Sequence, residues 1–515
     1  MADRVDRREF LGRLASGGAV LTLPGFLASC GVQQATSMTR PLPVNPALEW
    51  FGIDEATCAR VMSELTAKGA DIADLYFQHA RRNTLALEDG TLADATSGID
   101  QGVGLRVVSG GLTGYSFTED LTPPAMLAAA RTASAIATGT AIDVPKSYSP
   151  SPEGDLYRTT VPWSEVGVDR KLPILQSVEA LAKSMDTAVE KVSAYWVDGE
   201  ERITIATLDG RLVTDHRPMT RLTVLVTAKK GGQVQTGFSN ISAREDIDWY
   251  TDERLTAIVR EAVDRTMILF EARRPPAGEM PVILSSGASG ILLHEAIGHG
   301  MEADFNRTGL SVYSDMMGKK VAEPSVTIVD QATIPHERGA LNYDDEGVGT
   351  GRTVLVEDGI LTSYLHDLKT AMEYGTASTG SGRRQSYKFP PLPRMSCTFM
   401  EAGPHERDEI IAAVDRGIVC ETYTNGRVQI GAGDYTFSVK NAWLVERGKI
   451  TAPIKDALIR GNGPDTLTRI TMVGDDARFD TGGWTCGKDG QNVPVSQGIP
   501  TVLVSSLSVG VESSA

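Results

Sequence analysis

One short segment of the chain carries side chains that could bind a metal ion and activate water. Two of the seven histidines lie in the sequence Leu293-His294-Glu295-Ala296-Ile297-Gly298-His299-Gly300. Imidazole groups bind metal ions, and a carboxylate that is not itself a ligand can take a proton from the bound water. The segment therefore indicates metal-assisted hydrolysis. The alternative is that both histidines are satisfied inside a core and that Glu295 is a surface charge.

The two histidines are five residues apart, one more than in the common His-Glu-x-x-His zinc motif. Five residues of a straight α-helix turn through about 500°, so the two side chains would point about 140° apart. Both can reach one ion only if the helix widens or ends between them. Gly298 lowers the cost of such a break, and a single π-turn would have the same effect.

The residues around the motif must supply a helix and a further ligand. The apolar residues Ile291, Leu292 and Leu293 directly precede His294 and predict a buried helix. Two histidines are too few for a zinc site, so a third ligand must come from another part of the chain.

The motif lies in a C-terminal region whose start is marked by a sharp break in the helical pattern. Arg273-Arg274-Pro275-Pro276-Ala277-Gly278 ends that pattern, and we place a domain boundary there. We expect residues 275–515 to form a Gly-rich, mostly β domain that carries the motif helix. Its expected strands are short, at 326–330, 353–357, 360–367, 418–424, 437–446 and 500–509.

The region before the boundary, residues 48–274, has the pattern of an N-terminal α+β domain. A loop-like stretch at 144–160 divides it into two helix–strand sets, which could be two subdomains. Asp54 is a plausible N-cap for the first helix, and Asp89-Gly90 and Ser109-Gly110-Gly111 are typical of hairpin turns. The expected helices are 53–68, 123–138, 166–191 and 252–271. The expected strands are 74–79, 84–88, 102–108, 112–118, 194–198, 201–207, 212–221 and 222–229. The predicted fold class of the whole chain is α+β.

The composition is that of an ordinary globular protein with an excess of acidic residues. The 515 residues carry a formal net charge of -16, which argues against nucleic acid as the main partner. There are five cysteines, too few for a disulfide scaffold in a chain of this length. Cys58, Cys397 and Cys420 are expected to be small buried hydrophobes, with a Cys397–Cys420 disulfide as an open alternative.

Residues 1–30 resemble an export signal rather than part of the fold. The sequence around Arg7-Arg8 resembles a twin-arginine (Tat) signal, and Leu27-Ala28-Ser29-Cys30 resembles a bacterial lipobox. We therefore expect an exported protein on the periplasmic side, attached to the membrane only through lipid on Cys30. Residues 31–47 would be the tether. If the segment is instead an amphipathic N-terminal helix and the signal is not used, the protein is cytoplasmic.

Several ordered segments resemble one protein family. They are residues 290–309, which contain the histidine motif, and residues 343–347, 379–387, 391–395, 472–474 and 486–491. Together they resemble the TldD/PmbA metalloprotease family, specifically its TldD-type catalytic subunit. The resemblance covers roughly residues 50–510 and is most specific between residues 284 and 500.

This resemblance implies a zinc peptidase and assigns roles within the motif. His294, His299 and Cys486 would bind zinc, and Glu295 would be the catalytic base that activates the zinc-bound water. It further implies unfolded or extended peptides as substrates, and a homodimer or a heterodimer with a PmbA/TldE-type subunit. Two alternatives remain. The chain could be a non-catalytic scaffold or partner subunit, or a metal-dependent amide hydrolase that acts on cell-wall peptides.

Other polar residues are open to more than one interpretation. Arg383 and Arg384 could bind the substrate peptide or be solvated loop charges. Asp344, Asp345 and Glu346 could bind a second ion or orient a histidine, but an exposed acidic turn is the favoured interpretation. The remaining candidates are expected to be surface or core histidines: His336, His366 and His405. If Cys486 is not a ligand, the next candidates along the chain are Glu302 and Asp304.

Overall fold

The computed structural model describes residues 45–511, except for the side chain of Asn425. The predicted signal, Cys30 and nearly all of the predicted tether lie outside the described residues. Helix α2 (Pro46–Glu49) begins within the range 31–47, and its Leu48 is fully buried, so the last residues of the predicted tether belong to the folded part. The prediction of an α+β fold is confirmed.

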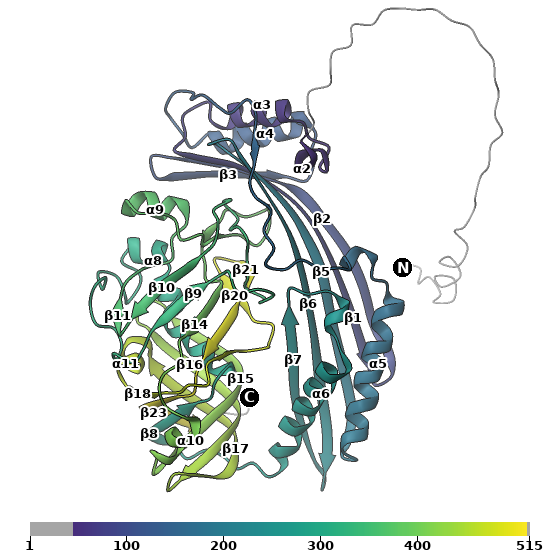
Figure 1. Cartoon of the computed structure of the whole chain (residues 1–515), viewed down its shortest axis with the longest axis vertical. Helices are drawn as coiled ribbons and strands as arrows, with labels where there is room; N and C mark the ends of the chain where they lie inside the picture. Colours follow the sequence, from purple (N-terminus) through teal and green to yellow (C-terminus); the bar gives the residue numbers. More distant parts are fainter. Residues whose placement is uncertain (1–44, 512–515) are drawn as a thin grey trace, which may run out of the picture. The chain divides into compact units, whose positions relative to one another are not determined.

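The N-terminal region is built on one large sheet, most of whose strands are long and antiparallel (Figure 1). The strand order is β3-β2-β1-β5-β6-β4, with β7 paired to β6. The strands are β1 (Ile72–Glu88), β2 (Thr91–Ser109), β3 (Leu112–Thr118), β4 (Ser149–Pro150), β5 (Val189–Thr207), β6 (Arg211–Lys230) and β7 (Gln233–Ala243). The sets on both sides of the stretch 144–160 share this sheet, because β1 pairs with β5. The stretch itself adds β4, which pairs with β6.

Several strands of this sheet are longer than predicted, whereas β3 has the predicted bounds. The predicted pairs 74–79 with 84–88, 194–198 with 201–207, and 212–221 with 222–229 are each one continuous strand, β1, β5 and β6. Polar residues such as Arg81 and Arg82 interrupt the apolar pattern, but they stay in register with Glu200 and Gly199 of β5. The backbone ladder continues past polar side chains, which a hydrophobic pattern cannot reveal. Strand β7 was not predicted, for the same reason.

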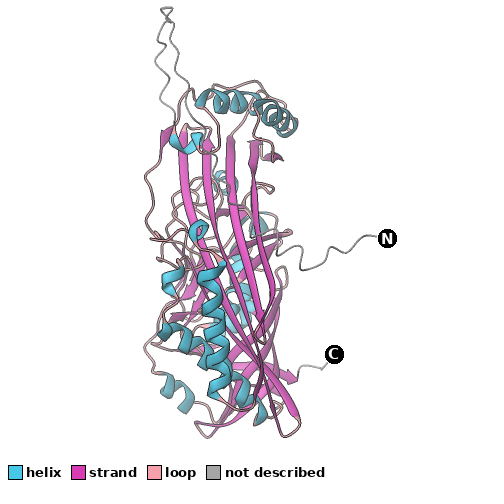
Figure 2. Cartoon of the chain, turned by 90° about the vertical axis from the view of Figure 1, so that its right-hand side faces the viewer, coloured by secondary structure: helices cyan, strands magenta, loops and turns pink. Residues whose placement is uncertain are grey.

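Helices cover this sheet at two places. Helices α3 (Glu55–Leu65) and α4 (Pro123–Ser134) pack together at one end, and the predicted N-cap is confirmed, since Asp54 Oδ1 accepts from Thr57 N at 2.7 Å. Helices α5 (Val168–Met185) and α6 (Asp252–Met267) lie against β5, β6 and β7 (Figure 2). Helix α5 ends earlier than predicted because β5 begins at Val189.

The C-terminal region contains a sheet that closes on itself. Its order is β17-β16-β15-β8-β23-β18, and pairing of β17 with β23 completes the ring. The strands are β8 (Gly278–Leu284), β15 (Arg416–Gln429), β16 (Asp434–Glu446), β17 (Lys449–Asn462), β18 (Ile470–Val473) and β23 (Val502–Val511). The motif helix packs into the hydrophobic core that this sheet encloses.

A second sheet and two hairpin-like pairs complete this region. The sheet has the order β11-β10-β9-β14-β22-β19. Its strands are β9 (Ile328–Gln331), β10 (Arg352–Glu357), β11 (Ile360–Leu361), β14 (Cys397–Met400), β19 (Arg478–Phe479) and β22 (Ser496–Ile499). The two-stranded pairs are β12 (Gly382–Arg383) with β13 (Leu392–Pro393), and β20 (Thr485–Lys488) with β21 (Gln491–Pro494). The short helices include α8 (Ala303–Arg307), α9 (Leu368–Tyr374), α10 (Arg407–Ala412) and α11 (Gly463–Thr468).

Two further observations concern the whole described chain. None of its helices is both long enough and apolar enough to cross a membrane. Cys397 on β14 and Cys420 on β15 are both buried, free cysteines, so the disulfide alternative does not hold.

Candidate metal centre

The motif helix changes its winding at the histidines. It runs from a 3₁₀ turn (Ala288–Gly290) through α7 (Ile291–Leu293), a π-turn at His294–Gly298 and a second 3₁₀ turn (His299–Met301). The π-turn widens the helix between the histidines, as their spacing requires. The residues of α7 are buried in the C-terminal core, as predicted.

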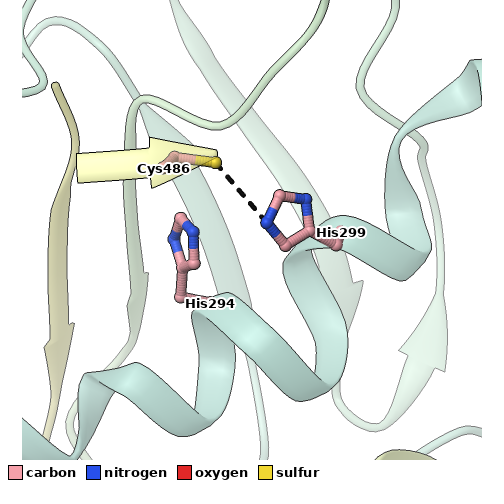
Figure 3. A group of neighbouring side chains, drawn as sticks. All are labelled: His294, His299 and Cys486. Atoms are coloured by element: carbon pink, nitrogen blue, oxygen red, sulfur yellow. Dashed lines mark hydrogen bonds between the residues drawn. The ribbon is translucent and has the colours of Figure 1, made fainter. Parts of the chain in front are cut away.

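The widened helix brings both histidines to one side, where a cysteine from a distant strand meets them (Figure 3). Ligand-capable atoms of His294, His299 and Cys486 all lie within 4.8 Å of one another. The Cys486 Sγ of β20 is 3.5 Å from His299 Nε2, and the two imidazole rings have centroids 5.0 Å apart. All three side chains are buried, with exposed fractions of 5%, 5% and 1%.

The electrostatics of the cluster favour a thiolate. Burial raises the pKa of Cys486, but His294 and His299 lower it by more, so its pKa lies well below the ordinary value of a thiol. Burial lowers the pKa of His299, whereas Glu302 and Cys486 raise it well above the usual range. The thiolate is the form of cysteine that binds metal.

Glu302 and Lys488 form a charged pair on the side of His299 that faces away from Cys486. Glu302 is fully buried and its Oε2 lies 3.0 Å from His299 Nδ1 and 3.1 Å from Lys488 Nζ. Burial raises the pKa of Glu302, but Lys488 and His299 lower it to about 2, so the carboxyl is ionised. Lys488 Nζ also lies 2.8 Å from Asp304 Oδ1. From the sequence, Glu302 and Asp304 are expected only as replacement ligands. Their supporting role was not predicted, although the spacing of three residues between His299 and Glu302 on a helix indicates it.

The donors fit a metal ion. Two imidazoles and a thiolate form a set suited to a metal of intermediate softness. His294 Nδ1 is buried and has no hydrogen-bond partner within residues 45–511. A buried polar atom without a partner is costly, and metal binding at the cluster would fix the orientation of this ring.

Glu295 follows His294 directly in the π-turn and is half-buried. In the described part of the chain its carboxylate makes no hydrogen bond or ion pair. It is therefore a free carboxylate next to the three-residue cluster.

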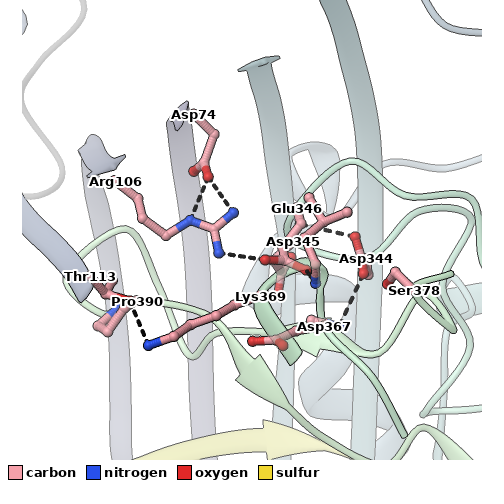
Figure 4. A network of polar contacts seen from close by, with 12 residues as sticks. Asp74, Arg106, Thr113, Asp344, Asp345, Glu346, Asp367, Lys369, Ser378 and Pro390 are labelled. Carbon is pink, nitrogen blue, oxygen red and sulfur yellow. Dashed lines mark hydrogen bonds and ion pairs between the residues drawn. The ribbon is translucent and has the colours of Figure 1, made fainter. Parts of the chain in front are cut away.

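The acidic turn is buried, not exposed. Asp344, Asp345 and Glu346 are exposed by at most 2%, so the favoured interpretation was wrong. Arg106 of β2 bridges Asp74 of β1 and Glu346 (Figure 4), and Arg217 of β6 lies 2.6 Å from Asp345. These ion pairs join the N-terminal sheet to the C-terminal region. A local acidic sequence did not reveal them because the cationic partners are more than 100 residues away.

The two arginines of the Gly/Ser-rich loop are also buried, so the solvated-loop alternative is wrong. Arg383 donates to the carbonyls of Met395 and Pro494, the latter at 2.7 Å. Arg384 lies 3.1 Å from Asp74 and donates to the Asp345 carbonyl at 2.7 Å. Their predicted contact with substrate stays a prediction.

His366 is buried, whereas His336 and His405 are partly exposed, and none of them belongs to the cluster.

Comparison with known proteins identifies relatives along most of the chain. Residues 73–137, 161–270 and 277–511 match the domains described as PmbA/TldA metallopeptidase domain 1, central domain and C-terminal domain. The chain is 36% identical over 474 residues to the metalloprotease TldD homolog of Haemophilus influenzae, covering 90% of this chain and 98% of that protein. It is 26% identical over 449 residues to the zinc metalloprotease TldD homolog of Saccharolobus solfataricus, covering 86% and 97%. The fold is similar to that of TldE from Thermococcus kodakarensis, with a TM-score of 0.69 and 18% identity over 88% of this chain and 99% of that one.

Proposed function

Because the chain belongs to the PmbA/TldD family of metallopeptidases, we propose that it is a zinc-dependent peptidase whose zinc ligands are His294, His299 and Cys486. The observation that carries the proposal is the buried cluster of these three side chains at the π-turn. Three protein ligands leave a position for water or substrate, which is the arrangement of catalytic rather than structural zinc sites. A relative described as a zinc metalloprotease supports the choice of metal.

In this proposal each residue of the chain has a separate task. Zinc, when bound, would lower the pKa of water and polarise the scissile carbonyl. Glu295 takes a proton from the attacking water and passes it to the leaving amine nitrogen. Glu302 accepts the Nδ1–H of His299, so that Nε2 is free to bind the ion.

The substrates would be unfolded or extended peptides, and a PmbA/TldE-type subunit would be the partner. The fold similarity to TldE is compatible with either member of such a pair. The complete set of His294, Glu295, His299 and Cys486 favours the catalytic member, because a scaffold subunit has no use for all four. A hydrolase of cell-wall peptides would use the same groups and differs only in substrate.

The decisive experiment separates metal binding from chemistry. Glu295→Gln keeps the side-chain volume but cannot accept the water proton. We expect this variant to retain about one zinc per chain and to lose at least about 10²-fold in kcat on extended peptides. Glu357→Gln, at an exposed position on β10, is the matched control and should keep wild-type activity. If Glu295→Gln cleaves peptides at the wild-type rate, Glu295 is not the catalytic base. If the purified wild-type chain contains no zinc, the scaffold alternative is favoured.

We further propose that the chain is exported by the twin-arginine route and attached to the membrane through Cys30. The support is the order of basic start, apolar run and lipobox in residues 1–30. Arg7→Lys with Arg8→Lys should keep the protein in the cytoplasm, and Cys30→Ala should release it from the membrane. Unchanged membrane association of Cys30→Ala would contradict the lipid anchor.

A further inference from the structure

A large cleft lies between the N-terminal sheet and the C-terminal region. It has a volume of about 990 Å³, and its lining includes Arg221, Asn240, Ser286, Tyr423, Gly483 and Trp484. Gly483 and Trp484 precede Cys486 by three and two residues, so one wall of the cleft is the loop that leads to the metal centre. This loop is anchored on β7, because Gly483 N donates to Asn240 Oδ1 at 2.6 Å and Ser242 N donates to Thr481 O at 3.0 Å.

Arg221 of β6 enters this cleft without a partner. Its guanidinium makes no hydrogen bond or ion pair within residues 45–511, and its Nε is buried. The stem of the side chain packs so closely on Gly483 that a Cβ there would lie 2.7 Å from Arg221 Cδ. Burial lowers the pKa of Arg221. A half-buried guanidinium that has no hydrogen-bond or ion-pair partner is stabilised when an anion binds it.

Arg338 is not in the cleft lining, but it contacts the loop that forms this wall of the cleft and is bound only to neutral groups. Its Nε donates to Trp484 O at 2.9 Å, its Nη1 to Ser242 Oγ at 3.0 Å, and its Nη2 to Thr485 Oγ1 at 3.3 Å. Burial, together with the charges of Arg221 and Arg244, lowers the pKa of Arg338 to about 9. The positive charge of this group of arginines is therefore unbalanced, in a chain whose net charge is -16.

The carboxylates that line the same cleft do not neutralise these two arginines. Glu261 lies 2.7 Å from Arg265, and Glu421 lies 3.5 Å from Arg407. Asp480 accepts from Trp484 Nε1 and from Gly482 N. Asp476 accepts from Thr501, and Asp264 is exposed on α6 and makes no ion pair within residues 45–511.

We propose that Arg221 and Arg338 form a subsite that binds a carboxylate of the peptide substrate. The carboxylate is either the C-terminal one or that of an Asp or Glu side chain. This inference rests on the proposed peptidase function and adds a preference among its substrates. Thr485 and Cys486 point to opposite faces of β20, as neighbours on a strand do. The carboxylate would therefore bind on the other face of β20 from the metal cluster, and its effect should fall on binding more than on turnover.

The test compares three peptides of one sequence on the full, zinc-loaded chain. The first has a free C-terminal carboxylate and an internal Glu, the second has a C-terminal amide, and the third has Gln in place of Glu. We expect the first peptide to have a kcat/KM about tenfold higher than one of the other two peptides, mainly because its KM is lower. If the C-terminal amide lowers kcat/KM, the subsite binds the C-terminal carboxylate. If the change of Glu to Gln lowers it, the subsite binds the side-chain carboxylate.

Variants show whether the arginine causes the preference. Arg221→Gln should reduce the ratio between charged and neutral peptide to about one, and Arg221→Lys should retain part of it. Arg460→Gln, at an exposed position on β17, should leave the ratio unchanged. Zinc content and thermal unfolding of Arg221→Gln show whether the variant is folded.

Binding to zinc-loaded Glu295→Gln, followed by fluorescence anisotropy, separates this inference from the proposed function. If the wild-type chain cleaves all three peptides equally well, the subsite is refuted and the peptidase stands. If it cleaves none, but Glu295→Gln binds the charged peptide about tenfold more tightly, the subsite stands and the peptidase function is refuted. Equal binding of all three peptides overturns the subsite in either case.

Discussion

The Nδ1 atom of His299 lies 3.0 Å from a carboxylate oxygen of Glu302, so the opposite ring nitrogen, Nε2, faces Cys486. This contact fixes which nitrogen of His299 is available to a metal ion. Lys488, two residues after Cys486, lies 3.1 Å from the same Glu302 oxygen. The carboxylate therefore connects the motif helix to the strand that supplies the third side chain of the cluster.

Glu302→Gln should weaken zinc binding without removing any ligand. The amide can still accept from His299, but it lacks the charge that raises ligand basicity and pairs with Lys488. Partners of this kind typically contribute about 10–100-fold to metal affinity. Chelator competition measures the change, and Glu357→Gln serves as the exposed control. Unchanged zinc affinity would mean that the hydrogen bond from His299 suffices without the Glu302 charge.

Gly298→Ala should destabilise the π-turn. A Cβ at this position would lie 1.9 Å from Met395 Sδ and 3.2 Å from the Leu293 carbonyl oxygen. Met395 is fully buried, so the neighbouring core must shift, which typically costs about 1–3 kcal/mol. Urea unfolding measures the loss. Gly349→Ala, where a Cβ would have no atom within 4 Å, should change stability far less. Equal stability of the two variants would show that the turn adapts freely.

Arg106→Gln should be among the most destabilising substitutions outside the metal centre. Arg106 bridges two buried carboxylates, Asp74 and Glu346, and its loss leaves both short of their counter-charge. Removing one partner of a buried ion pair typically lowers the free energy of unfolding by about 3–5 kcal/mol.

The matched control for Arg106→Gln is Arg352→Gln, which breaks the exposed ion pair with Glu401. That pair should contribute no more than about 1 kcal/mol. The free energies of unfolding of the two variants, measured with denaturant, test the contrast. A similar loss in both would mean that Asp74 and Glu346 find other partners, such as Arg384 for Asp74.

The features that the sequence predicted correctly depend on neighbours along the chain. Asp54 caps the helix that begins at the next residue by accepting from Thr57 N, and the five-residue spacing of His294 and His299 required the helix to widen or end between them. Both follow from backbone geometry within one or two turns.

The features that it missed depend on residues far apart. The acidic turn at 344–346 is buried only because Arg106 and Arg217 come from the N-terminal sheet. The sequence pattern predicted two short strands where the structure has one long strand, because polar residues interrupt the apolar pattern. The backbone of these polar residues pairs with another strand, which the pattern does not show. Likewise, the role of Lys488 required knowing that β20 lies beside the motif helix, which one sequence without structure does not show.

Cobalt substitution gives the sharpest test of Cys486 as a ligand. Cobalt(II) bound by a thiolate has a sulfur-to-metal charge-transfer band that imidazole and carboxylate ligands do not produce. We expect this band in the cobalt-loaded wild-type chain and its loss in Cys486→Ala, together with most of the zinc affinity. Cys397→Ala and Cys420→Ala are matched controls, because burial raises the pKa of both thiols and neither lies in the cluster. Both controls should retain the band. Should Cys486→Ala keep the band and full zinc occupancy, Cys486 is not a ligand. Asp304, whose carboxylate lies 2.8 Å from Lys488, would then be the first replacement to examine.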